Sequence, residues 1–122
     1  VAGWRRARAL GVKAAWTLVR RAACGDALMR GVEVYREEAE RIAGGCPCSD
    51  GDLATAHHEA ARRARAVFSE RAAGDESESF REALEGRLMD LHRQLAVHNE
   101  SSSRRVALEV VSSIYAERLA EL

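Results

Sequence analysis

The chain has 122 residues, with 19 basic and 19 acidic side chains, 47% apolar residues and only 5% aromatic residues. This length suffices for one domain with a buried core, and the apolar fraction and zero net charge exclude an intrinsically disordered chain. Alanine, arginine, glutamate and leucine are abundant, whereas β-branched and aromatic residues are few. The composition therefore predicts an all-α protein.

Cysteine usage and hydropathy indicate the cellular setting. Three cysteines are an odd number for the disulfide framework of a small secreted domain, and the N-terminus lacks the pattern of a signal peptide. The longest uncharged apolar runs, Ala14 to Val19 and Val110 to Ala116, are far shorter than the roughly 18 residues of a membrane-spanning helix. We expect a cytoplasmic, reduced protein, and a fragment of a longer one because the chain starts without Met.

Apolar residues recur every three or four positions, which predicts about five helices in a single domain over residues 1–122. The basic first helix, within 1–23, carries six basic residues and no acidic one, and residues 26–122 form the rest of the bundle. Short connections predict an elongated antiparallel arrangement. Breaks are expected at Gly25-Asp26, Gly44-Gly45, Cys46–Gly51, Gly74-Asp75 and Ser101–Ser103. The expected helices are 4–23, 26–44, 50 or 52 to about 73, 77–98, and a fifth after Ser103.

Several catalytic and binding motifs are absent. The single lysine, Lys13, does not stand in the Gly-Lys-Ser/Thr context of a phosphate-binding loop. After His58-Glu59, Arg62 occupies the position where a zinc protease needs its second histidine. No histidine follows a glutamate at the three-residue spacing of a di-iron bundle. We therefore predict no catalytic, cofactor-binding or metal-binding residue, and no enzymatic activity for this part of the protein.

Three cysteines and a histidine allow one alternative. Cys24, Cys46, Cys48 and His57 form a tetrahedral zinc site if two breaks of the chain meet. However, structural zinc motifs keep at least two residues between paired cysteines, which favours three incidental thiols. The neighbours His57 and His58 point about 100° apart on a helix. Because His57 lies on the apolar stripe of its helix, we predict a core histidine with a backbone or hydroxyl partner.

The basic first helix allows a second alternative. A basic amphipathic helix with tryptophan can bind an anionic membrane or nucleic acid, and the chain is then a free-standing helical adaptor. So short a run of charge is common on solvated helical surfaces, and the rest of the chain carries a compensating charge of −6. A solvated face, or one that meets an acidic neighbour, is the favoured interpretation, and no nucleic-acid partner is expected.

Two ordered sets of weak motifs lie between Leu28 and Leu122. The first comprises Tyr35–Gly45, Asp52-Leu53, His57, Val67-Phe68, Gly74–Glu76, Phe80, Leu84-Glu85 and His98-Asn99. The second comprises Ser101–Arg104, Ala107-Leu108, Val110-Val111 and Ile114. The first set resembles the helical middle domain of the atlastins, and the second resembles the guanylate-binding proteins; both are large GTPases of the dynamin superfamily. The short Cys46–Cys48 loop and the lack of a following transmembrane hairpin favour the guanylate-binding branch.

This resemblance implies a helical middle or stalk domain that follows a GTPase domain. GTP and Mg²⁺ would bind in that preceding domain, whose Arg-Asp guanine-recognition pair does not occur in this chain. The implied role is to transmit the conformational change of GTP hydrolysis to dimerisation or membrane contact. The implied partners are the chain's own GTPase domain, a second copy of the protein and a membrane surface.

Overall fold

The computed structural model contains three helices: α1 (Ala2–Gly44), α2 (Asp50–Arg71) and α3 (Ser77–Ala120). It describes the backbone of residues 2–122 and the side chains of residues 11–122. No strand occurs in this part of the chain, so the all-α prediction is confirmed. The prediction of about five helices is wrong, because two expected breaks lie inside continuous helices.

The first of these errors is at Gly25-Asp26, which lies in the middle of α1. Glycine inside a helix costs about 1 kcal/mol relative to alanine, and local sequence alone therefore favours a break. The neighbours of this pair, Cys24 and Ala27, are fully buried, and a Cβ at Gly25 would lie in ordinary contact with Phe80 of α3. Packing against the rest of the bundle therefore outweighs the weak helix propensity.

The second error is at Ser101–Ser103, which α3 passes through without interruption. Serine lowers helix propensity only modestly, whereas glycine and proline lower it strongly. Ser102 is 2% exposed and the preceding Asn99 is 4% exposed, so this part of α3 still packs against the bundle. A polar run without glycine or proline was insufficient to end the helix.

The other predicted ends are close to the observed ones. α1 ends at Gly44, and the expected loop follows it. α2 begins at Asp50, one of the two expected starts. Ser49 caps it, because its hydroxyl accepts a hydrogen bond from the Asp52 backbone N–H at 3.1 Å. Gly74 turns the chain between α2 and α3 with a φ of +87°, a conformation that glycine adopts without steric cost.

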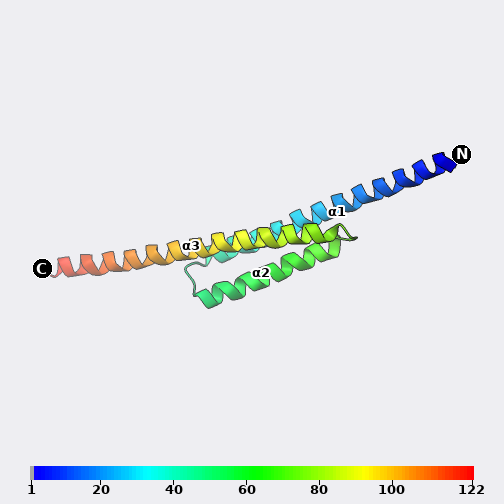
Figure 1. The fold of residues 1–122 in the computed structure, drawn as a ribbon. Helices are drawn as coiled ribbons and strands as arrows, with labels where there is room; N and C mark the ends of the chain where they lie inside the picture. Colours follow the sequence, from blue (N-terminus) through cyan, green and yellow to red (C-terminus); the bar gives the residue numbers. More distant parts are fainter. Residues whose placement is uncertain (1) are drawn as a thin grey trace.

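The helices form an elongated bundle (Figure 1). α2 runs antiparallel to both long helices, whereas α1 and α3 run in the same direction. At about 1.5 Å per residue, the 43 residues of α1 and the 44 of α3 are each about twice as long as the 22 of α2. The N-terminal part of α1 and the C-terminal part of α3 therefore project beyond the bundle at opposite ends.

The core lies where all three helices overlap. α2 packs mainly on α1 and approaches α3 at far fewer points. Its alanines allow this close approach: Ala60, Ala61 and Ala64 are 0–1% exposed. The largest fully buried side chains are Tyr35, Phe68, Leu84, Leu88 and Cys24.

Candidate functional site

The four residues of the hypothetical zinc site lie far apart. Cys24 packs at the far end of α2, where its thiol donates to the Ala73 carbonyl at 3.5 Å. Cys46 and Cys48 lie just beyond the C-terminal end of α1. The helix extends for twenty residues between Cys24 and its end at Gly44. At 1.5 Å per residue that separation is about 30 Å. No group of three or more potential ligands occurs among the described residues, and the geometry rules out the four-residue site.

The Cys46–Cys48 loop is fastened to α3 by one buried side chain. Asn99 accepts a hydrogen bond from the Cys48 backbone N–H at 2.8 Å and donates one to the Cys48 carbonyl at 3.0 Å. The Cys46 thiol donates to the Ile42 carbonyl at 3.4 Å. Burial, followed by the neighbouring Cys48, raises the pKa of the Cys46 thiol. Because the thiolate is the reactive form, this environment does not activate Cys46 as a nucleophile.

Three aromatic rings meet near the middle of the bundle, one from each helix. The hydroxyl of Tyr35 on α1 is 2.7 Å from Nδ1 of His57 on α2. The ring of His57 stacks on that of His92 on α3, with 3.8 Å between centroids and 31° between planes. The structure confirms the hydroxyl partner expected as one of two alternatives for His57, but His57 is half-buried, so the prediction of a core histidine is wrong. Burial raises the pKa of Tyr35 to about 12, so this hydroxyl keeps its proton at neutral pH.

An ion pair between α2 and α3 lies beside the His57–His92 stack. Arg65 of α2 donates two hydrogen bonds to Glu85 of α3, at 2.6 and 2.9 Å. The hydrogen bond to Arg65 lowers the pKa of Glu85. Both side chains are almost half exposed, so solvent screens the pair. It orients α2 on α3 more than it stabilises the fold.

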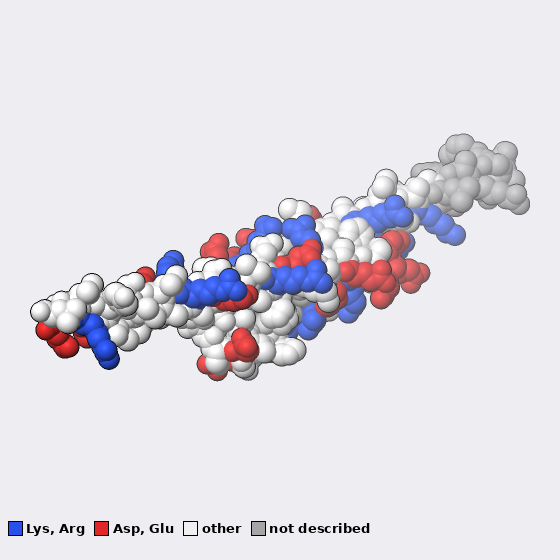
Figure 2. Space-filling model, turned by 60° about the vertical axis from the view of Figure 1, so that its left-hand side comes forward, with Lys and Arg blue, Asp and Glu red and all other residues white. Residues whose placement is uncertain are grey.

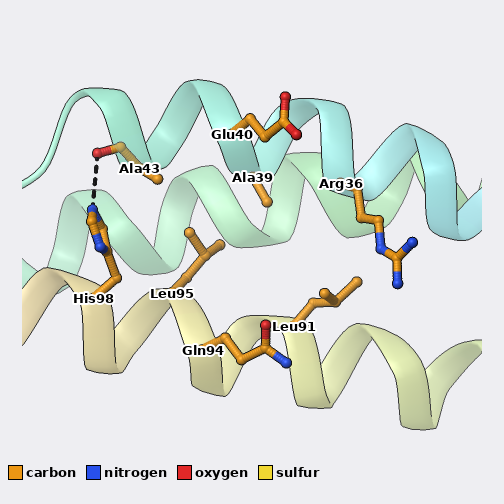
Figure 3. Close-up of a pocket in the computed structure, with 8 residues that line it drawn as sticks. All are labelled: Arg36, Ala39, Glu40, Ala43, Leu91, Gln94, Leu95 and His98. Carbon is orange, nitrogen blue, oxygen red and sulfur yellow. Dashed lines mark hydrogen bonds between the residues drawn. The ribbon is translucent and has the colours of Figure 1, made fainter.

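A shallow groove of about 380 Å³ runs between α1 and α3 (Figure 3). In this view α2 lies behind the two helices, so the groove opens on the opposite face of the bundle. Polar side chains stand at its edges, and His98 Nε2 is 3.3 Å from the Ala43 carbonyl. The apolar lining residues are Ala39, Ala43, Leu91 and Leu95, and the polar ones are Arg36, Glu40, Gln94 and His98.

The two projecting helix ends expose apolar side chains. On α1, Val12, Trp16 and Val19 are 52–60% exposed. The described basic residues of this end include Arg20, which pairs with Glu76 at the α2–α3 turn at 3.4 Å, whereas the side chains of Arg5, Arg6 and Arg8 lie outside the described residues. On the projecting end of α3 the exposed apolar residues are Val106, Leu108, Val110, Val111, Ile114, Tyr115 and Leu119, and Leu122 follows the end of the helix.

Charge is distributed unevenly along the molecule (Figure 2). Basic and acidic side chains alternate over the central bundle, whereas residues 106–116 of the projecting end of α3 carry a single charged side chain, that of Glu109. Many of the central charges form exposed pairs, such as Arg63 with Glu38 at 2.9 Å. This pattern is typical of a solvated middle section and an end that makes apolar contacts.

Comparison with known proteins identifies the family. A family model described as "Guanylate-binding protein, C-terminal domain" matches residues 11–121. The chain belongs to this family. Searches of curated proteins and of solved structures found no match. The match to the guanylate-binding protein C-terminal domain extends over both projecting ends as well as the bundle.

Sequence patterns identified some features of this guanylate-binding protein C-terminal domain and missed others. The apolar stripes located the core helices, and His57 was placed correctly on such a stripe. Asn99 and His92 were missed, because each acts on a segment more than 30 positions away. The only local signal was their spacing: both lie on α3 close to Leu88 and Leu95, which are buried.

None of the three helices, over the described residues, is both long and apolar enough to cross a membrane.

Proposed function

We propose that this chain is the helical middle, or stalk, part of a guanylate-binding-protein-like large GTPase. In this proposal the chain is not itself an enzyme. GTP and Mg²⁺ bind in a GTPase domain that precedes it, and the helices transmit the resulting conformational change. The family match supports the guanylate-binding branch over the atlastin branch.

The observation that carries the proposal is the continuity of the two long helices. α1 and α3 pass without interruption through the places where local sequence favours a break. They overlap in the bundle and project at opposite ends (Figure 1). A displacement applied to the N-terminal end of α1 is therefore carried through a packed core to the far end of α3. Packed helices move as rigid bodies because close-packed interiors resist continuous deformation.

The projecting end of α3 supports the second part of the proposal. Leu108, Val111 and Tyr115 are 58–68% exposed on this end, and their steps of three and four residues place them on one helical face. Such a stripe is suited to pack against another helix. We assign this contact to a second copy of the parent protein, with the membrane as a further partner of the parent and the cytoplasm as its location.

Continuity can be tested in the parent protein at Gly25. Gly25→Pro removes a helical hydrogen bond and kinks α1, whereas Gly25→Ala keeps the helix, because its Cβ meets only Phe80 at 3.9 Å. A spin label at position 108 and another in the preceding GTPase domain report their separation with and without a GTP analogue. We expect a nucleotide-dependent change in the wild type and Gly25→Ala, and its loss in Gly25→Pro. An unchanged separation in the wild type, or a preceding domain of another type, overturns the proposal.

A second candidate function rests on the exposed N-terminal end of α1. Trp16 is 60% exposed, and Lys13 stands three positions before it on the same helix. An amphipathic basic helix with tryptophan binds anionic lipid surfaces. Sedimentation with vesicles that contain phosphatidylserine tests this. Salt-sensitive binding that is lost in Lys13→Glu/Arg21→Glu favours the adaptor, and equal sedimentation with neutral vesicles removes it.

A further inference from the structure

The contact between α2 and α3 depends on two stacked imidazoles. The rings of His57 and His92 lie 3.8 Å apart, centroid to centroid. At this distance two neutral rings pack favourably, whereas two imidazolium ions repel each other strongly in a partly desolvated site. α2 approaches α3 at few points, and the stack is one of the contacts that join them, beside the Arg65–Glu85 pair.

The hydrogen bond from α1 depends on the charge of His57 as well, because only a neutral His57 can accept the Tyr35 hydroxyl hydrogen at Nδ1. Tyr35 is fully buried, and its hydroxyl has no other hydrogen-bond partner among the described residues. We therefore assign its hydrogen to Nδ1 of His57, which accepts it only in the neutral form. Protonation of His57 would place a hydrogen on Nδ1 and leave the buried hydroxyl hydrogen of Tyr35 without an acceptor. A buried donor left unpaired destabilises the folded state.

His92 contributes its ring to the stack and no hydrogen bond from Nδ1. Its Nδ1 is buried and has no hydrogen-bond partner among the described residues. A hydrogen on this atom would be a buried donor with no acceptor.

The surrounding charges also favour a neutral His57. His58 and Arg65 face His57 from α2, and His92 and Glu85 face it from α3, while Tyr35 is the titratable group that contacts it from α1. Burial lowers the pKa of His57 most, and the three positive or protonatable neighbours lower it further, against an opposing effect of Glu85. The carboxylate of Glu85 is already engaged by two hydrogen bonds from Arg65.

We propose that Tyr35, His57 and His92 form a pH-sensitive latch that fastens α2 to α1 and α3 when both imidazoles are neutral and loosens it on acidification. The latch lies within the bundle, away from both projecting ends, and its action does not depend on the proposed role in a GTPase.

The direction of the pH dependence follows from linkage. A histidine whose pKa is lowered in the folded chain binds its proton more readily after unfolding. Stability is therefore complete above the unfolded value of 6.5 and falls as the pH drops below it, until the folded-state pKa is also passed. One excluded proton multiplies the unfolding equilibrium constant by up to about tenfold for each pH unit in this range.

The test is urea unfolding of the full chain at pH 7.5 and pH 5.5, followed by circular dichroism. The variants are His57→Gln, His92→Gln and the double variant, which keep polarity but cannot be protonated. The control is His98→Gln, because His98 is exposed and lies outside the stack, with its ring nitrogen 3.3 Å from the Ala43 carbonyl. We expect the midpoint to fall at pH 5.5 in the wild type and in His98→Gln, and to fall much less in the double variant. An equal fall in the double variant overturns the proposal.

A second measurement on the wild type covers the case in which the variants do not fold. The imidazole carbon resonances of the four histidines are followed by nuclear magnetic resonance during acid titration. We expect His57 to titrate below 6.5, and amide hydrogen exchange along α2 to accelerate more than along α1 once the intrinsic pH effect is removed. Titration of His57 at or above 6.5, or equal acceleration in both helices, overturns the latch.

Discussion

The side-chain amide of Asn99 on α3 pairs with both polar groups of the Cys48 backbone: it accepts from the N–H at 2.8 Å and donates to the carbonyl at 3.0 Å. Asparagine is the natural residue for this contact, because its amide supplies one acceptor and two donors in a single plane. The contact joins the loop between α1 and α2 to a helix that begins almost thirty residues later. It closes the bundle at the end opposite to the Gly74 turn.

Replacement of Asn99 by alanine should destabilise the fold by about 1–3 kcal/mol, because two backbone groups lose their partner in a partly buried site. Asn99→Asp should also destabilise, since it keeps the acceptor but sets a negative charge against the Cys48 carbonyl. The control is Gln94→Ala, at an exposed position of the same helix. Urea unfolding at neutral pH measures the difference, and equal midpoints for the Asn99 and Gln94 variants would show that the contact carries no stability.

Two glycines inside helices should respond oppositely to alanine. A Cβ at Gly31 would lie 3.1 Å from the Ala64 carbonyl oxygen and 3.2 Å from Leu84 Cδ1, so Gly31→Ala should push α2 and α3 away from α1 and lower the unfolding midpoint. A Cβ at Gly86 meets nothing within 4 Å. Gly86→Ala should therefore stabilise by about 0.5–1 kcal/mol through helix propensity alone. A stabilising Gly31→Ala would contradict the close packing of the three helices.

The two halves of α3 should differ sharply in their contribution to stability. Leu88 is 1% exposed, and Leu88→Ala should cost about 2–5 kcal/mol because it leaves a cavity in the core. Leu108 is 67% exposed on the projecting end, and Leu108→Ala should change the free energy of unfolding by no more than about 0.5 kcal/mol. Thermal unfolding of the isolated chain at low concentration compares the two. A large cost at Leu108 would show that this end packs against something in the isolated chain.

The sequence predicted the core better than the connections between helices. Leu84, Leu88 and Leu95 lie on a stripe with helical spacing, and all three are buried, because amphipathic periodicity depends only on local positions. The breaks at Gly25 and Ser102 were predicted wrongly, since propensities of about 1 kcal/mol or less are outweighed by burial that local sequence does not reveal. The roles of Asn99 and His92 depend on contacts between distant segments, so their spacing relative to Leu88 and Leu95 could indicate the inner face of α3 but not their partners.

The exposed pair of Arg65 and Glu85 gives a pH dependence in a different range from that of the histidines. The hydrogen bond with Arg65 lowers the pKa of Glu85 in the folded chain. The pair therefore stabilises the fold above the ordinary pKa of 4.5, and this stabilisation disappears as the pH falls through the lowered pKa. Glu85→Gln should cost about 0.2–1 kcal/mol at pH 7, because the pair is solvent-screened. This cost should shrink in 1 M salt, and it should be smaller at pH 3 than at pH 7, because the carboxylate becomes protonated below its ordinary pKa of 4.5. Urea unfolding of the wild type and Glu85→Gln at both pH values measures it.

The matched control is Glu109→Gln, on the exposed projecting end of α3, which should change stability at neither pH. A cost that persists unchanged at pH 3 would mean that the side chain contributes through packing and not through its charge.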